Sequence, residues 1–131
     1  MRFKRDEGFR FSFGTPILAF FTIEELNGKK IGTSEGEARV LDLSPNGMKF
    51  ASQLDIPKSN QNDVKITVRF TLHESEHHIQ GQIIWKQKAV DGFFYGMQFS
   101  INEEDKEIMI KDLKHFAKWQ YNKNSPSSSN K

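Results

Sequence analysis

The most constraining feature of this sequence is residues 64–72, where apolar and polar side chains alternate without exception. Apolar residues occupy the even positions from Val64 to Leu72, and Lys, Thr or Arg occupies each odd position. Successive side chains of a β-strand point to opposite faces, so the pattern indicates a strand with one buried and one exposed face. Such a strand needs neighbours on its edges, since an exposed edge invites unwanted pairing.

Other segments rich in β-forming residues are separated by turn signals. These segments span residues 9–14, 17–23, 29–31, 39–44, 48–51, 79–86 and 93–99. Asn27-Gly28 and Asp91-Gly92 are typical of hairpin turns. No interval between the segments shows helical periodicity, so we expect antiparallel hairpins, and closing them into a barrel removes the exposed edges. The sequence therefore predicts an all-β fold with a terminal helix, built on a small antiparallel β-barrel of about six strands.

The pattern changes to a helical one after Ser100. Apolar residues recur at helical spacing and form one stripe, made of Ile108, Met109, Leu113 and Phe116, with Tyr121 as a further candidate. Ser100 and Glu103 form a possible capping box, and Asn102 is an alternative cap. We predict an α-helix that starts near residue 102 and packs on the open end of the barrel. A dimer seam is the weaker interpretation of the same stripe.

Length and composition indicate one cytoplasmic domain. A chain of 131 residues can bury a core without disulfide bonds or structural metal ions. We divide it into a basic arm (1–14), a barrel with its helix (15–122) and a flexible tail (123–131). There is no cysteine, which is compatible with a reducing compartment. The apolar run 16–23 is too short for a bilayer, so we expect no membrane insertion. The net charge of +2 argues against bulk nucleic-acid binding.

Residues 39–50 are predicted to form a strand, a tight turn and the start of a second strand. Pro45 suits the second position of a type I turn, and Asn46 tolerates the bent backbone after it. By alternation, one face of the first strand carries Val40, Asp42 and Ser44, and the other face carries Leu41 and Leu43.

A carboxylate and a hydroxyl therefore stand side by side, next to Gly47, which lets a ligand approach the backbone. This arrangement suits the Watson–Crick edge of an unpaired guanine, which offers N–H groups to a carboxylate. The alternative is that Asp42 and Ser44 only brace the turn through local hydrogen bonds.

The segment Asp42-x-Ser44-x-x-Gly47 resembles the Asp/Asn-x-Ser-x-x-Gly motif of the PilZ family, receptors for the bacterial second messenger cyclic di-GMP. A leader with Arg5 and Arg10 precedes the first strand, as in that family. Residues 81–85 and 95–99 resemble two later strands of the family, and the likeness covers residues 2–120. It implies that Asp42 and Ser44 bind guanine, that Gly47 lines the pocket, and that Arg5 and Arg10 bind phosphate and guanine. Cyclic di-GMP is then the ligand, and no cofactor is implied.

The arginine leader departs from the family pattern. The family has three residues between its two arginines, whereas four separate Arg5 from Arg10. Residues five apart on a regular strand face opposite sides, so a kink at Gly8 would be needed to bring both to one ligand. We expect an arm that is disordered or variable without ligand and folds over it when bound. Arg10 is then the essential contact and Arg5 the second.

The sequence shows no catalytic or metal-binding pattern. His77 and His78 are neighbours on a predicted strand and face opposite sides, so we expect all four histidines to be solvated and no metal to be bound. Neither a nucleophile with its base nor a phosphate-binding glycine loop is evident, although a triad formed only in space stays open. We therefore do not expect this protein to be an enzyme.

Three binding functions remain as hypotheses. The first is a cyclic di-GMP receptor that signals to an unknown effector protein. The alternative is a PilZ-like docking module that does not bind the nucleotide. The third is single-strand nucleic-acid binding, which would need exposed aromatic rings. It is the weakest hypothesis, because the phenylalanines alternate with polar residues and so face inward.

Overall fold

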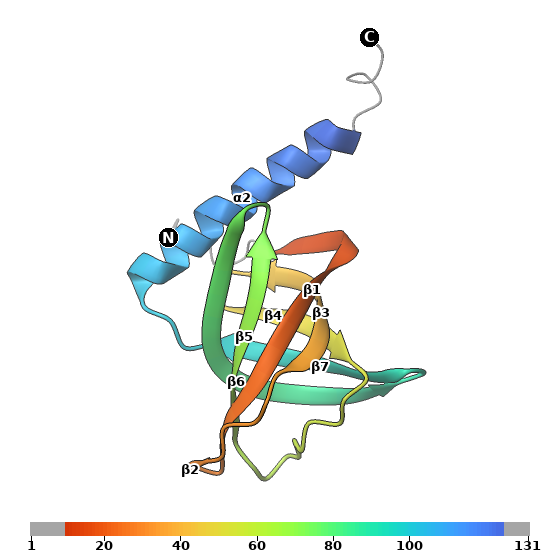
Figure 1. The fold of residues 1–131 in the computed structure, drawn as a ribbon, viewed down its shortest axis with the longest axis vertical. Coiled ribbons are helices and arrows are strands. Elements are labelled where there is room, and N and C mark those ends of the chain that lie inside the picture. The colour runs from red at the N-terminus through yellow and green to blue at the C-terminus, as the bar shows by residue number, and fades with distance from the viewer. Residues whose placement is uncertain (1–9, 125–131) are drawn as a thin grey trace.

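Seven strands and one helix make up residues 10–124, the part of the chain that the computed structural model describes (Figure 1). The elements are β1 (Phe11–Leu26), β2 (Lys29–Lys30), β3 (Gly36–Ser44), β4 (Gly47–Ser52), β5 (Val64–Leu72), β6 (Ser75–Ala89), β7 (Gly92–Phe99) and α2 (Glu103–Asn124). Arg5, most of the predicted arm and residues 125–131 of the predicted tail lie outside the described residues. β1 begins at Phe11, so residues 11–14 belong to the first strand.

The strands form the closed antiparallel barrel that the sequence predicted. Their order is β2-β1-β3-β4-β7-β6-β5, and a ladder between β1 and β5 closes the six long strands, with β2 as an addition on the edge of β1. All ladders are antiparallel. The order is not a simple succession of hairpins, however, because β4 lies beside β7. Residues 53–63 must therefore cross one end of the barrel to reach β5.

The core follows the predicted alternation most closely in β5. Its apolar side chains are all at most 3% exposed: Val64, Ile66, Val68, Phe70 and Leu72. Opposite them, Phe50 stacks on Tyr95 with ring centres 5.1 Å apart, and both rings are fully buried. Burying a large apolar side chain contributes about 1.5–3 kcal/mol, so these inward-facing side chains are the main stabilising element of the barrel.

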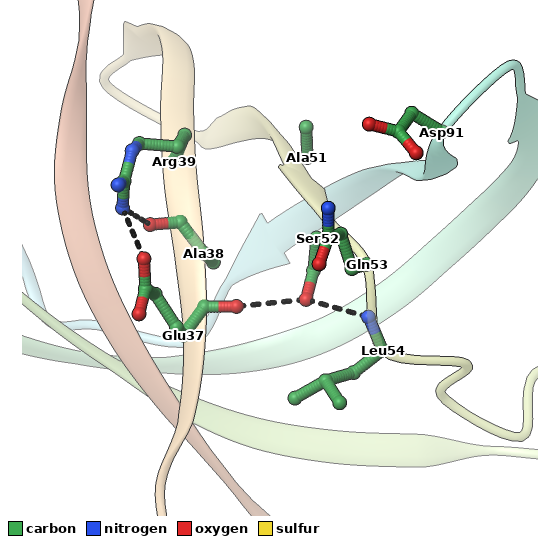
Figure 2. Close-up of a pocket in the computed structure, with 8 residues that line it drawn as sticks. All are labelled: Glu37, Ala38, Arg39, Ala51, Ser52, Gln53, Leu54 and Asp91. Carbon is green, nitrogen blue, oxygen red and sulfur yellow. Dashed lines mark hydrogen bonds and ion pairs between the residues drawn. The ribbon is translucent and has the colours of Figure 1, made fainter.

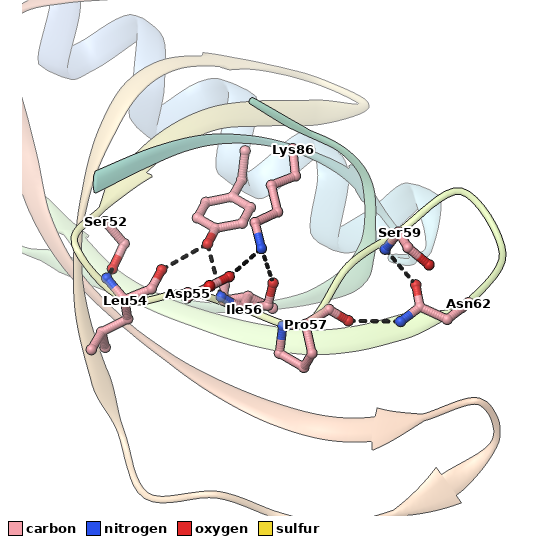
Figure 3. Close-up of polar contacts among 9 residues, drawn as sticks. Ser52, Leu54, Asp55, Ile56, Pro57, Ser59, Asn62 and Lys86 are labelled. Atoms are coloured by element: carbon pink, nitrogen blue, oxygen red, sulfur yellow. Dashed lines mark hydrogen bonds and ion pairs between the residues drawn. The ribbon is translucent and has the colours of Figure 1, made fainter. Parts of the chain in front are cut away.

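Tyr95 and Lys86 fix the first part of the crossing segment, residues 54–56, to the barrel (Figure 3). Tyr95 Oη donates to the Leu54 carbonyl at 2.7 Å and accepts from the Ile56 amide at 2.8 Å. Burial raises the pKa of Tyr95 above its ordinary value, so the hydroxyl keeps the proton that it donates. Lys86 pairs with Asp55 and donates to the Ile56 carbonyl at 2.8 Å. The crossing segment is therefore held firmly, and it runs at the end of the barrel away from the helix (Figure 1).

The helix begins as predicted, and Asn102 is the cap. Its side-chain oxygen accepts from the Asp105 amide at 2.7 Å, so of the two caps considered Asn102 is the one in use. Met109, Leu113 and Phe116 are buried against the barrel. The prediction was wrong for two members of the stripe, since Ile108 is 55% exposed and Tyr121 is 74% exposed. Both lie off the narrow line through residues 109, 113 and 116 that contacts the strands.

The first strand and the helix meet through aromatic rings. Phe11 and Phe13 face Phe116 edge-on, with ring centres 6.1 and 5.5 Å away. The helix lies across one end of the barrel, and its C-terminal half projects past the strands (Figure 1). Within residues 10–124, no helix is both long and apolar enough to cross a membrane.

Candidate functional site

A groove of about 590 Å³ lies where the start of β1 meets the β3–β4 turn, β6 and β7. Its lining residues are Arg10, Asp42, Ser44, Asn46, Gly47, Met48, Lys49, Ile84, Trp85, Gly96, Met97 and Gln98. The structure thus brings together Arg10, Asp42, Ser44 and Gly47, four of the five residues that the sequence predicted for the ligand site. The fifth, Arg5, lies outside the described residues.

Arg10 and Asp42 form an ion pair in the groove. They are 32 residues apart in sequence, and the antiparallel pairing of Ser12 with Asp42 brings them together. Arg10 points away from Phe11 and Phe13, as alternation predicted, and half of its side chain is exposed. The Asp42 side chain is only 17% exposed, so its carboxylate lies in the groove wall while the guanidinium lies at the rim.

Ser44 braces the β3–β4 turn. The residue is 5% exposed, and its hydroxyl donates to the Gly47 carbonyl at 3.2 Å. Pro45 and Asn46 both have negative φ angles, and a type I turn requires negative φ at its two central residues. The bracing interpretation therefore describes Ser44, whereas the carboxylate of Asp42 bonds to Arg10.

Gly47 has a packing reason to be glycine. A Cβ at this position would lie 2.3 Å from the Met97 carbonyl oxygen of β7. The backbone of β4 or β7 would have to move to relieve this clash. The missing side chain thus lets β4 and β7 pair closely at a position that lines the groove.

A β-bulge in β3 corrects the predicted faces of this strand. Val40 pairs with Phe50 and Asp42 pairs with Lys49, so two steps along β3 match one step along β4. As a result Val40 and Leu43 are both fully buried. The prediction that Val40 shares a face with Asp42 and Ser44 was wrong, because the extra residue shifts the phase of the alternation.

A second bulge, in β6, brings Ile84 and Trp85 into the groove. Ile83 pairs with Met97 and Trp85 pairs with Gly96, so Ile84 is the extra residue. Ile84 is 52% exposed and Trp85 is 38% exposed. The indole lies against the backbone of β7, since a Cβ on Gly96 would be 2.0 Å from Trp85 Nε1. Sequence reasoning missed both residues, although three successive apolar residues at 83–85 break the alternation and signal a bulge.

The groove carries more positive than negative charge. Among residues 10–124, Arg10 and Lys49 are the cations that line it and Asp42 is the acid. The Lys49 ammonium lies 4.9 Å from the centre of the Phe94 ring, a distance at which a cation is attracted to an aromatic face. Together with the exposed face of Trp85, this surface suits a ligand that combines planar rings with anionic groups.

Another hollow, of about 430 Å³, lies toward the far ends of β3 and β4 (Figure 2). Its polar groups bond mainly to one another. Ser52 Oγ donates to the Glu37 carbonyl at 2.7 Å and accepts from the Leu54 amide at 3.1 Å, and Arg39 pairs with Glu37 at 2.9 Å. It contains none of the predicted ligand residues, so we take the first groove as the functional site.

One histidine is not at the solvated surface that we predicted. The His77 side chain is 11% exposed, its Nε2 lies 2.9 Å from Asp112 Oδ2 of the helix, and its ring stacks on Phe70. The prediction was wrong for His77 because α2 covers this part of β6. Across residues 10–124, no three His, Cys, Asp or Glu side chains are grouped closely enough to hold a metal ion.

The fold is a small closed β-barrel whose groove joins an arginine before the first strand to a carboxylate on the third. A family model described as PilZ domain matches residues 3–116, and the chain belongs to this family. PilZ domains are binding and adaptor modules, and in general they are receptors for cyclic di-GMP. No curated protein matches the sequence.

Proposed function

We propose that this protein is a cyclic di-GMP receptor that binds the nucleotide in the groove and signals to a protein partner without catalysis. The observation that carries the proposal is the meeting of Arg10 with Asp42 in the groove of a PilZ domain. One residue comes from the arginine leader and the other from the Asp-x-Ser-x-x-Gly motif. Both sequence features that resembled the family therefore contribute a residue to the same groove, which supports the proposal.

The proposed contacts follow from the chemistry of each side chain. Asp42 bonds to Arg10 through Oδ1, and a carboxylate has a second oxygen that can accept the N–H groups of guanine. The planar guanidinium of Arg10 can bind phosphate oxygens or the O6/N7 edge of guanine in pairs. Trp85 offers an exposed ring for stacking on a base, and Lys49 supplies charge for a phosphate.

Two observations support the alternative, a docking module that does not bind the nucleotide. The Asp42 carboxylate already has a cationic partner, so a guanine would have to share it with Arg10. The leader also has one more residue between Arg5 and Arg10 than the family pattern. In this alternative the Arg10–Asp42 ion pair only stabilises the fold, and the partner protein binds elsewhere on the barrel.

Titration calorimetry of the whole protein with cyclic di-GMP, with GTP as the control nucleotide, tests the proposal. We expect saturable binding of cyclic di-GMP and much weaker binding of GTP. Single alanine variants at Arg2, Lys4, Arg5 and Arg10 then examine the leader. A large loss only at Arg5 and Arg10 supports the kinked register. Equal small losses at all four positions indicate general attraction to phosphate, and no binding by the unmodified protein favours the docking module.

A further inference from the structure

The charge pattern at the start of α2 contains one residue that does not fit its position. Glu103, Glu104 and Asp105 occupy the first turn, where negative charge is favoured by the helix dipole. Lys106 follows directly, although a cation near a helix N-terminus is unfavourable. Its side chain is only 20% exposed, so it does not simply extend into water.

The Lys106 ammonium instead connects the helix to the groove. It donates to Asn46 Oδ1 at 3.1 Å and lies 3.3 Å from Glu103 Oε2. Asn46 is the second central residue of the β3–β4 turn and lines the groove. The Asn46 carbonyl also accepts from the Phe99 amide at the end of β7, at 2.8 Å. The turn that carries the ligand motif is thus held from one side by β7 and from the other by α2.

We propose that Lys106 is a positioning residue of the groove and that it couples ligand binding to the order of the first turns of α2. This inference rests on the proposed function, since the ligand it concerns is cyclic di-GMP. A ligand that holds the β3–β4 turn in its bonded position strengthens the Asn46–Lys106 bond and so protects the helix start. Because coupling between two sites is reciprocal, loss of the Lys106 ammonium must in turn weaken ligand binding.

A separate contact allows this coupling to be localised. Phe11 and Phe13, which directly follow Arg10, pack on Phe116 in the middle of the helix. A ligand that binds Arg10 therefore affects α2 near residue 116 through these rings, independently of Lys106. The Lys106 route is expected to act only near residues 106–110.

Hydrogen exchange with mass spectrometry, with and without cyclic di-GMP, is the test. Lys106→Met removes the ammonium and keeps most of the aliphatic stem, and Lys111→Met is the matched control on an exposed position of the same helix. With ligand, we expect slower exchange of amides 106–110 in the unmodified protein and in Lys111→Met. Lys106→Met should lose that slowing, keep the slowing near residue 116, and bind the ligand about threefold to tenfold more weakly.

The outcomes separate this inference from the proposed function. If cyclic di-GMP binds and amides 106–110 respond equally in Lys106→Met and Lys111→Met, the coupling is wrong and the receptor function stands. If the unmodified protein does not bind cyclic di-GMP, both the receptor function and the coupling are wrong. A ligand-free comparison then tests the positioning role alone: the Phe99 amide should exchange faster in Lys106→Met than in Lys111→Met, and equal rates contradict that role.

Discussion

Replacing Asp42 distinguishes a ligand-binding carboxylate from one that only stabilises the fold. The side chain is 17% exposed and makes one ion pair, to an Arg10 side chain that is 51% exposed. An ion pair this open to solvent contributes only about 0.2–1 kcal/mol to folding. Asp42→Ala should therefore lower the free energy of unfolding by no more than about 1 kcal/mol.

The expected effect on binding is larger. A hydrogen bond from guanine to a carboxylate is charge-assisted and is worth about 1.5–3 kcal/mol. Loss of about 2 kcal/mol raises Kd roughly 30-fold, since each 1.4 kcal/mol corresponds to a factor of ten. Asp42→Asn keeps the size of the side chain and one acceptor oxygen but removes the charge, so it should lose less affinity than Asp42→Ala. Ser44→Ala should cost less, because the Ser44 hydroxyl bonds to the Gly47 carbonyl and affects the ligand only through the turn.

The assay is calorimetric titration with cyclic di-GMP, combined with urea unfolding of each variant. Asp91→Asn is the matched control, because it makes the same change in net charge at the hollow that holds none of the predicted ligand residues. We expect a folded Asp42→Ala with a large loss of affinity and an Asp91→Asn that binds normally. If Asp42→Ala unfolds, or if it folds and binds as tightly as the unmodified protein, the ligand-binding role of the carboxylate is refuted.

Three further predictions follow from the barrel. Tyr95→Phe should lower the free energy of unfolding, measured by urea unfolding, by about 1–3 kcal/mol, because the buried Ile56 amide loses its acceptor. Tyr121→Phe, on the exposed end of the helix, is the control and should leave the free energy of unfolding unchanged. Gly96→Ala should displace the Trp85 indole, change its fluorescence and weaken cyclic di-GMP binding, and an unchanged emission spectrum would contradict the close packing. The hydrogen bonds from Arg69 hold the pKa values of Glu35 and Glu76 below their ordinary 4.5, so their contribution to stability is present above pH 4.5 and is lost as pH falls through the lowered values. Arg69→Met should flatten the decline of stability below that pH, measured by urea unfolding at a series of pH values.

The barrel could be predicted because its strands carry local signals. The alternation in residues 64–72 and the turn at Asn27-Gly28 are properties of neighbouring residues, and the structure confirms both. The order of the strands was not predictable in this way. The pairing of β4 with β7 depends on contacts between residues about 50 positions apart, such as Gly47 with Gln98, and no local pattern encodes them.

Only part of the site could be predicted, for a related physical reason. Asp42 and Arg10 were found through a short motif and a leader, and the structure brings them together. Trp85 reaches the groove only because a bulge at Ile84 re-aims the strand. Lys106 reaches Asn46 only because α2 starts beside the β3–β4 turn. Both depend on three-dimensional placement, which an analysis of one strand or one helix at a time does not give.

The irregularity near the start of β1 separates the leader from the rest of the strand. Ser12 pairs with Asp42 and Ile17 pairs with Val40, so five steps along β1 match two along β3. In a continuous ladder, adding or removing one residue would turn every later side chain to the wrong face. Here the slack between Ser12 and Ile17 can take up such a change before the core strand is reached. The stretch between Ser12 and Ile17 can therefore change in length while the barrel keeps its register. The extra residue between Arg5 and Arg10 precedes the first pair of the ladder, Phe11 with Leu43, so it leaves that register unchanged.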